Sequence, residues 1–362
     1  MNRKRRARNS MEIREAIGLV IAGTNLTEEQ MLAVMDEIMS GEATPAQIGA
    51  FITALRMKGE TVEEITGAVR VMREKATRID TGINTAEGGV VVDTCGTGGD
   101  SSGTFNVSTA SAFVVAGAGI TVAKHGNRSI SSKCGSADVL EAAGVVLNLP
   151  PEDIGACIRE TGIGFLFAPA LHGAMRHAIG PRKEIGVRTI FNILGPLTNP
   201  AGANVQVLGV FAPELTQPLA QVLGRLGTRR ALVVHGEGNL DELTVTGMSR
   251  ISEWKDGEIT NYTITPADVG LATARLDELK GGETAEESAV LLKEVLTGKA
   301  GPRKDMVLLN SSAALMAAGS CGTLKDGVQM AAEIIDSGKA QAKLEALVAV
   351  SCRLAQKNGT LL

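Results

Sequence analysis

The feature that most constrains the fold is an alternation of short apolar runs and alanine-rich segments between residues 90 and 235. Runs rich in valine and isoleucine predict strands at 90–94, 120–123, 164–167, 205–210 and 231–234. The intervening segments predict helices at 109–116, 137–146, 152–161 and 215–226. Alternation of this kind requires crossover connections, so we expect an α/β fold with a mostly parallel central sheet flanked by helices.

The N-terminal part has a different pattern, which predicts a small all-helical domain. Three capping boxes, each a Thr followed three residues later by Gln or Glu, begin at Thr27, Thr44 and Thr61. After Thr44 the apolar residues recur with the spacing of one buried helix face, at Ile48, Phe51, Ile52 and Leu55. Beyond residue 283 we expect further helices at 284–298, 308–318, 325–337 and 340–356.

Three parts are expected along the chain: a basic tail, a helical domain and a large α/β domain. Five Arg and Lys residues lie in the first ten positions, which predicts a solvated, disordered basic tail at 1–10. We expect the helical domain at 11–82, with a return segment near 168–190, and the large α/β domain at 88–362.

Composition also excludes several classes of protein. The net charge of −4 and the aromatic content of 2% argue against nucleic-acid binding, which needs basic surfaces and stacking side chains. No apolar run is long enough to span a membrane. The five cysteines are widely spaced, without a CxxC pair, which favours the reducing cytoplasm over a disulfide framework or a zinc site.

Unusual polar segments follow four of the predicted strands, at 94–100, 124–128, 168–172 and 235–242. In an open parallel sheet the carboxyl ends of the strands share one edge, and ligands bind there. We therefore expect these four segments to line one rim of the sheet. This convergence is stronger evidence for a site than any one of the motifs.

Two of these segments have the chemistry of a phosphate site. Residues 96–100 (GTGGD) hold three glycines, which let backbone N–H groups approach a phosphate closely. The expected helix start near Asn106, Ser108 and Thr109 is a second anion site. Residues 124–128 (KHGNR) and the serines that follow offer many donors to pyrophosphate oxygens. The alternatives are an ordinary strand-to-helix turn and a solvated basic loop.

Two further groups of residues suggest a metal and an acceptor. Asp241 and Glu242 are adjacent acids, and Mg²⁺ is often shared between carboxylates and substrate phosphates. His172 and Arg182 lie in a basic stretch that suits an aromatic carboxylate. The alternatives are surface charge for the acids and an exposed basic helix for the second group. We interpret His235 as structural.

Taken together and in this order, the motifs resemble those of the anthranilate phosphoribosyltransferases, in the nucleoside phosphorylase-like phosphoribosyltransferase family. The resemblance covers roughly residues 12–358 and includes residues 135–138 (GSAD) and 188–200 (RTIFNILGPLTNP). It implies a small helical domain and a large α/β domain with the active site at the hinge between them. It also implies Mg²⁺, with two ions per active site, and a homodimer formed through the helical domain.

The resemblance assigns roles residue by residue. It implies phosphoribosyl pyrophosphate binding by Gly96, Gly99, Asp100, Thr104, Asn106, Ser108, Thr109, Lys124 and Ser136. It implies anthranilate binding by Gly96, Asn127, His172, Arg182, Gly195 and Pro196. It implies metal binding by Ser108, Asp241 and Glu242, and catalytic roles for Lys124, Asp241 and Glu242.

The activity implied is that of a glycosyltransferase: transfer of a phosphoribosyl group to the amine of anthranilate, the second step of L-tryptophan biosynthesis from chorismate. One departure is Gly173, where the family commonly has Pro after the histidine, and it loosens the backbone beside the acceptor site. Because of this departure, a phosphoribosyltransferase paralogue that uses another aromatic acceptor stays open as an alternative. A nucleoside phosphorylase of related fold and a non-catalytic nucleic-acid-binding homologue also stay open.

Overall fold

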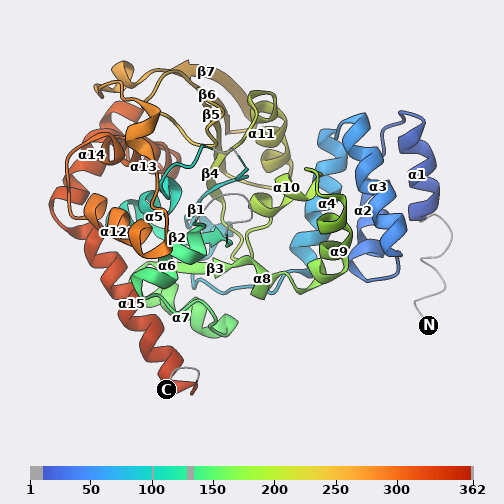
Figure 1. Ribbon diagram of the computed structural model, residues 1–362, viewed down its shortest axis with the longest axis horizontal. Helices are drawn as coiled ribbons and strands as arrows, with labels where there is room; N and C mark the ends of the chain where they lie inside the picture. The colour runs from blue at the N-terminus through green and yellow to red at the C-terminus, as the bar shows by residue number, and fades with distance from the viewer. Residues whose placement is uncertain (1–10, 100–101, 129–133, 360–362) are drawn as a thin grey trace. The chain divides into compact units, whose positions relative to one another are not determined.

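The computed structural model describes residues 11–99, 102–128 and 134–359; the predicted basic tail at 1–10 lies outside them. The chain forms two compact units. The helical unit consists of the residues up to Thr77 together with Pro169–Thr198, and the sheet unit consists of Arg78–Ala168 together with Asn199 onward. Figure 1 shows the course of the chain through both.

The helical unit is built on four N-terminal helices, α1 (Ile13–Ile21), α2 (Glu28–Met39), α3 (Pro45–Lys58) and α4 (Val62–Lys75). The three predicted capping boxes are confirmed at the starts of α2, α3 and α4. The predicted apolar face of α3 is buried. Helix α1 was not predicted, because Glu12 makes no side-chain cap at its start.

The return segment of the helical unit contains only short elements. They are α8 (Ala168–Leu171), which begins in the sheet unit, then η2 (Gly173–Met175), α9 (Arg176–Ile185), α10 (Phe191–Leu194) and η3 (Gly195–Leu197). Of these, η2, α9, α10 and η3 begin without a side-chain cap. Helix α9 packs against α3 and α2, and Thr77 N donates to Leu171 O at 2.9 Å. Tertiary packing therefore holds this segment more than local signals do.

The sheet unit contains a seven-stranded sheet in the order β3-β2-β1-β4-β5-β6-β7. Its strands are β1 (Val91–Gly96), β2 (Thr121–Gly126), β3 (Ile163–Phe167), β4 (Val205–Gly209), β5 (Arg230–Gly236), β6 (Ser249–Lys255) and β7 (Glu258–Ile264). The five strands from β1 to β5 are parallel. The predicted fold class, a small helical domain with a large α/β domain around a mostly parallel sheet, is confirmed.

The antiparallel hairpin of β6 and β7 was not predicted. Its turn is at Asp256 and Gly257, both with positive φ of 51° and 89°. An Asp-Gly pair between alternating strands is a hairpin signal, since both turn residues adopt positive φ. The sequence therefore contains a local signal for this turn.

Helices cover the sheet on its flanks: α5 (Val107–Gly117), α6 (Ser136–Ala143), α7 (Pro151–Thr161), α11 (Thr216–Arg225), α12 (Ala285–Leu296), α13 (Pro302–Ala318), α14 (Leu324–Asp336) and α15 (Lys339–Lys357). Helices α5 and α13 pack on each other and on the central strands, and α11 packs on β5 and β6. Helix α13 begins six residues before the expected 308, with Pro302 at its first position. No described helix has both the length and the apolar character needed to cross a bilayer.

Strand order places the switch point of the sheet between β1 and β4. From β1 the chain adds β2 and then β3 on one side, and it returns to add β4 and β5 on the other. In such sheets the crevice for a ligand lies outside the carboxyl ends of the strands where the order reverses. The ends of β1 and β4, at Gly96 and Gly209, are therefore where a site is expected.

Candidate functional site

The segment that contains Asp241 and Glu242 lies directly on the ends of the switch-point strands. A Cβ atom on Gly209, the last residue of β4, would lie 1.5 Å from the Asp241 backbone oxygen. A Cβ atom on Gly96, the last residue of β1, would lie 2.3 Å from Asp241 Oδ2. Only glycine leaves room at these two positions. The acid pair is therefore fitted against the sheet rather than projecting from the surface.

The two carboxylates connect the other predicted phosphate-binding parts. Asp241 Oδ2 accepts a hydrogen bond from the backbone N–H of Gly98 at 2.7 Å. Glu242 Oε1 accepts one from the N–H of Ser108, in the first turn of α5, at 3.2 Å. The structure thus brings together the acid pair, the glycine loop after β1 and the start of α5. These bonds join two of the four segments that the sequence predicted at one rim, 94–100 and 235–242.

Asn310 on α13, which sequence reasoning missed, holds the segment after the acid pair. Its Oδ1 accepts from Leu243 N at 3.0 Å, and its Nδ2 donates to Leu243 O at 2.8 Å and to Met306 O at 2.9 Å. Asn310 is 2% exposed. An Asn within an apolar helical run was the only signal in the sequence, and its partner is 67 residues away.

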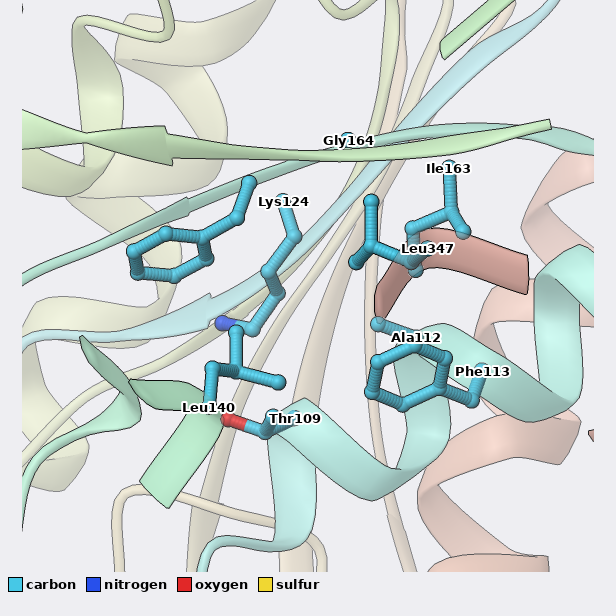
Figure 2. A pocket seen from close by; sticks show the side chains of 9 residues that line it. Thr109, Ala112, Phe113, Lys124, Leu140, Ile163, Gly164 and Leu347 are labelled. Carbon is cyan, nitrogen blue, oxygen red and sulfur yellow. The ribbon is translucent and has the colours of Figure 1, made fainter. Parts of the chain in front are cut away.

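At the start of α5, the side chains of Asn106 and Ser108 make polar contacts, whereas that of Thr109 faces the interior. Asn106, at the N-cap position, donates through Nδ2 to Cys134 O at 3.2 Å, and the Ser108 hydroxyl lies 3.5 Å from Lys124 Nζ. Thr109 is buried, and its hydroxyl oxygen has no hydrogen-bond partner among the described residues. Figure 2 shows it at an interior space of the sheet unit. Thr109 therefore faces the interior with its side chain.

Lys124 corrects one expectation. We expected it on a loop after a strand ending at residue 123, but it lies within β2 and is 3% exposed. Its Nζ donates to Thr94 O at 2.6 Å and to His125 O at 3.3 Å, and lies 3.5 Å from Ser108 Oγ. The β2–β3 ladder continues to Gly126, which keeps these residues in the strand.

The stem of Lys124 belongs to the core (Figure 2). It lines an interior space with Thr109 and apolar side chains that include Phe113, Leu140 and Leu347. The space is too small for a water molecule. It is a packing gap under the rim and not a ligand cavity, so Lys124 presents its charge to the rim from below.

The loop after β2 is closed by Ser136 at the start of α6. Ser136 Oγ accepts from Asn127 N and donates to Asn127 O, both at 3.2 Å. Arg128 was predicted to offer donors to pyrophosphate, but its guanidinium pairs with Asp138 and Glu141, each at 2.8 Å. These carboxylates, Glu141 first, raise the pKa of Arg128 above its usual value. Arg128 thus ties its loop to α6.

The remaining donor-site residues are Thr104, Gly99 and Asp100. Thr104 N donates to Ser102 Oγ at 3.3 Å, and Thr104 forms an isolated antiparallel bridge with Lys280. Gly99 has a φ of 75°, which favours glycine. Asp100 lies outside the described residues, as do Ser131 and Ser132.

Four of the predicted acceptor residues lie in the helical unit. His172 precedes η2 and is 8% exposed, and burial lowers its pKa to about 4, so its ring is neutral at pH 7. The Arg182 guanidinium carbon lies 5.2 Å from the centre of the Phe191 ring, and burial lowers the Arg182 pKa. Gly195 and Pro196 form the start of η3. Gly96 and Asn127 belong to the sheet unit.

The acid pair fits a magnesium ion that is shared with a substrate. Among the described residues no group of three His, Cys, Asp or Glu side chains could hold a metal ion alone. Asp241 and Glu242 offer carboxylate oxygens beside the backbone N–H groups of Gly98 and Ser108. Mg²⁺ commonly takes one or two carboxylates and completes its shell with phosphate oxygens and water.

Comparison with known proteins agrees with this geometry. Residues 88–341 match the family described as glycosyl transferase family, a/b domain, and residues 14–76 match its helical bundle domain. The anthranilate phosphoribosyltransferase of Desulfotalea psychrophila is 60% identical over 342 residues, which cover 94% of this chain and 98% of that protein.

Solved structures are similar over the same length. Anthranilate phosphoribosyltransferase from Thermus thermophilus has a TM-score of 0.87 at 47% identity, covering 93% of this chain and 99% of its own. The Saccharomyces cerevisiae enzyme in complex with PRPP and Mg has a TM-score of 0.83 at 26% identity. Its complex with 4-fluoroanthranilate has a TM-score of 0.84 at 25% identity, and both cover 94% of this chain and 98% of theirs. The chain belongs to the anthranilate phosphoribosyltransferases of the glycosyl transferase family.

Proposed function

We infer that this chain transfers the phosphoribosyl group of 5-phosphoribosyl 1-pyrophosphate to the amine of anthranilate. The products are N-(5-phosphoribosyl)anthranilate and pyrophosphate, in the second step of L-tryptophan biosynthesis. The observation that carries the proposal is a pair of hydrogen bonds. One joins Asp241 to Gly98 of the glycine loop, and the other joins Glu242 to Ser108 at the start of α5. These are the parts that a diphosphate donor needs.

The reaction is a substitution at C1 of the ribose. The bond from C1 to the pyrophosphate oxygen breaks, the bond from C1 to the anthranilate nitrogen forms, and the nitrogen then loses one proton. The departing pyrophosphate carries the growing negative charge. Backbone N–H groups of the glycine loop after β1 and of the first turn of α5 would stabilise that charge. In the structure the N–H groups of Gly98 and Ser108 donate to Asp241 and Glu242, so these two would exchange a carboxylate partner for the donor.

Magnesium belongs to this proposal, with two ions per active site. Ser108 and Glu242 would hold one ion, and Asp241 and Glu242 the other. When bound, magnesium neutralises charge on the pyrophosphate. The contact between Ser108 N and Glu242 Oε1 supports the first pairing, and the yeast relative is described in complex with PRPP and Mg.

Lys124 would act on the donor through its charge. Its ammonium group is buried beneath the rim and lies 3.5 Å from Ser108 Oγ. A fixed positive charge in a water-poor environment stabilises a nearby developing anion more than an exposed one does. Lys124 therefore complements the magnesium ions on the side of the sheet that faces α5.

Anthranilate is the proposed acceptor. Arg182 would pair with its carboxylate, neutral His172 and Asn127 would contact it, and Gly195, Pro196 and Gly96 would border its ring. The complex of the yeast relative with 4-fluoroanthranilate supports this choice. No general base is required, since an aniline nitrogen is neutral at pH 7 and can attack before it loses its proton. Catalysis would depend on positioning and electrostatics.

We also propose a homodimer formed through the helical unit and a cytoplasmic location. The first follows from the family resemblance. The second is supported by the cysteines: all five lie in the described residues and none forms a disulfide, as expected for a reducing compartment. We further propose that the sheet unit is the domain that binds phosphoribosyl pyrophosphate.

The test is a fluorescence assay with the full chain. The loss of anthranilate fluorescence is followed after addition of phosphoribosyl pyrophosphate and Mg²⁺, with an EDTA control. We expect loss of signal only with both donor and metal. If the fluorescence does not fall although calorimetry still detects donor binding, anthranilate is not the acceptor. If the donor does not bind, the proposed function as a whole is refuted.

A further inference from the structure

The hydrogen-bonded ladder between β1 and β2 stops early. It pairs Val91 with Thr121 and Val92 with Val122, and no further pairs follow. On the outer sides, by contrast, β1 stays paired with β4 as far as Gly96, and β2 stays paired with β3 as far as Gly126. The two central strands that carry the glycine loop and Lys124 are therefore separated towards the rim. Buried backbone groups in such a gap need other partners.

Side chains supply those partners. Asp93 Oδ1 accepts from the backbone N–H of His125 at 3.1 Å. Asn199 Nδ2 donates both to Ala123 O and to Asp93 Oδ2, each at 2.8 Å. Lys124 Nζ donates to Thr94 O at 2.6 Å. Backbone groups of both strands thus bond to side chains where a regular ladder would bond them to each other.

Asp93 and Asn199 form a buried pair on one face of the gap. Their exposed fractions are 0% and 6%. Thr94 Oγ1 bonds to Ser108 O in α5, and successive side chains of a strand point to opposite faces, so Asp93 points away from α5. Asn199 Oδ1 also accepts from Ala201 N at 2.9 Å, which fixes the orientation of its amide.

A buried carboxylate in a central strand has an energetic cost. Burial raises the pKa of Asp93, and the charge of Lys124 opposes that effect. An apolar pair would avoid the cost, but it would leave the N–H of His125 and the carbonyl of Ala123 without these partners. The pair is consistent with a need to keep the two strands apart.

We infer that Asp93 and Asn199 are positioning residues for donor binding. They bridge the gap between β1 and β2, and so they set the spacing between the glycine loop after β1 and the segment of Lys124 and Asn127 in and after β2. The inference rests on the proposed function, since it takes phosphoribosyl pyrophosphate as the ligand that spans both segments. Neither residue is assigned a contact with the donor itself.

The experiment exchanges the two side chains. Asn199→Asp places two carboxylates against each other and removes the donor to Ala123 O. Adding Asp93→Asn restores a donor–acceptor pair between the two positions and keeps an acceptor for His125 N–H. The dissociation constant of phosphoribosyl pyrophosphate from the full chain is measured by calorimetry in the presence of Mg²⁺. This measurement needs no acceptor. The melting temperature is measured in parallel.

We expect Asn199→Asp to weaken donor binding by about 10-fold or more, from the two opposed carboxylates and from the Ala123 carbonyl that loses its donor. The exchange variant should recover the part of this loss that comes from the opposed carboxylates, as coupled neighbours do, while the Ala123 carbonyl stays without its donor. The matched control is Gln206→Met. Gln206 is the register partner of Asp93 on β4, is 2% exposed and bonds through Nε2 to Cys95 Sγ at 3.1 Å. We expect it to change stability but to alter donor binding by less than about twofold.

Three outcomes would overturn the inference: unchanged donor affinity in Asn199→Asp, no recovery in the exchange variant, or an equal loss in Gln206→Met. If Asn199→Asp does not fold, Asp93→Asn alone is compared with the exchange variant by the same criterion. If the wild-type chain binds the donor but does not consume anthranilate, the assignment of anthranilate as acceptor is refuted. The donor dissociation constants of the variants then still test the positioning role of Asp93 and Asn199. A wild-type chain that does not bind the donor would refute both.

Discussion

The donor residues of the sheet unit and the acceptor residues of the helical unit are held in different ways. Asp241 lies against Gly96 and Gly209, which have no room for a side chain, and both acids of the pair bond to distant parts of the chain. His172 directly precedes η2 and Arg182 lies on α9, and neither of these short elements has a side-chain cap. A Cβ atom on the neighbouring Gly173 would meet nothing within 4 Å. The donor half is thus closely packed, whereas the acceptor half has room to vary.

The largest effect should come from the acid pair. We expect Asp241→Ala with Glu242→Ala to lower kcat/KM by at least about 100-fold and to abolish its Mg²⁺ dependence, because the metal contribution amounts to several kcal/mol. The chain contains its own control. Residues 276–279 repeat the sequence of residues 240–243, Leu-Asp-Glu-Leu, and Asp277→Ala with Glu278→Ala should leave the rate near normal. Equal losses in both variants would refute the metal role.

Gly209→Ala tests the close packing of the donor half. The added methyl group would lie 1.5 Å from the Asp241 backbone oxygen, so the acid pair must move. A displacement of about 1 Å can cost about 100-fold in rate. Gly322→Ala is the control, because its Cβ meets nothing within 4 Å. Equal kcat/KM values for the two variants in steady-state kinetics would contradict the close packing at Gly209.

Arg182→Ala tests the acceptor half separately. Loss of a charge-assisted hydrogen bond should raise the KM for anthranilate by about 10-fold or more, while the KM for phosphoribosyl pyrophosphate changes little. Lys183→Ala, at the exposed next position, should change neither constant. An equal rise in both KM values after Arg182→Ala would remove Arg182 from the acceptor pocket.

His172 makes the stability of the helical unit depend on pH. Its pKa is lowered to about 4 in the fold, from a usual 6.5, so between these values the unfolded chain binds more protons. The free energy of unfolding should therefore fall as the pH drops below 6.5. We expect a loss on the order of 1–2 kcal/mol between pH 7 and pH 5 relative to His172→Gln, measured by urea denaturation. A difference that does not vary with pH would contradict the neutral buried ring.

The smallest effect is expected at Gly173. Its φ lies outside the left-handed region and its Cβ position is open, so Gly173→Ala should raise the free energy of unfolding by about 0.4–1 kcal/mol. Gly41→Ala in the same unit is the opposite case, with a φ of 76° and a Cβ 2.5 Å from the His177 ring. If Gly173→Ala destabilises the chain as Gly41→Ala does, the acceptor half is as closely packed as the donor half.

Much of the fold was predictable because its signals are local. The capping boxes at Thr27, Thr44 and Thr61 and the valine-rich runs of the parallel strands each depend on a few neighbouring residues. The β6–β7 hairpin was missed although its Asp256-Gly257 turn is also a local signal. The position of Lys124 was wrong for a different reason: whether a strand continues through a charged residue depends on the strand that pairs with it.

By itself, the sequence determined the order of the motifs, the parallel sheet and the chemistry gathered at its rim, because periodicity, caps and glycine loops act over short distances. Only the tertiary structure decided which of two identical segments meets that rim. The tetrapeptide Leu-Asp-Glu-Leu occurs twice. At 240–243 Asp241 meets the ends of β1 and β4 and Glu242 meets the start of α5, whereas at 276–279 Asp277 pairs with the neighbouring Arg275. Identical residues differ here because their partners are supplied by distant parts of the chain.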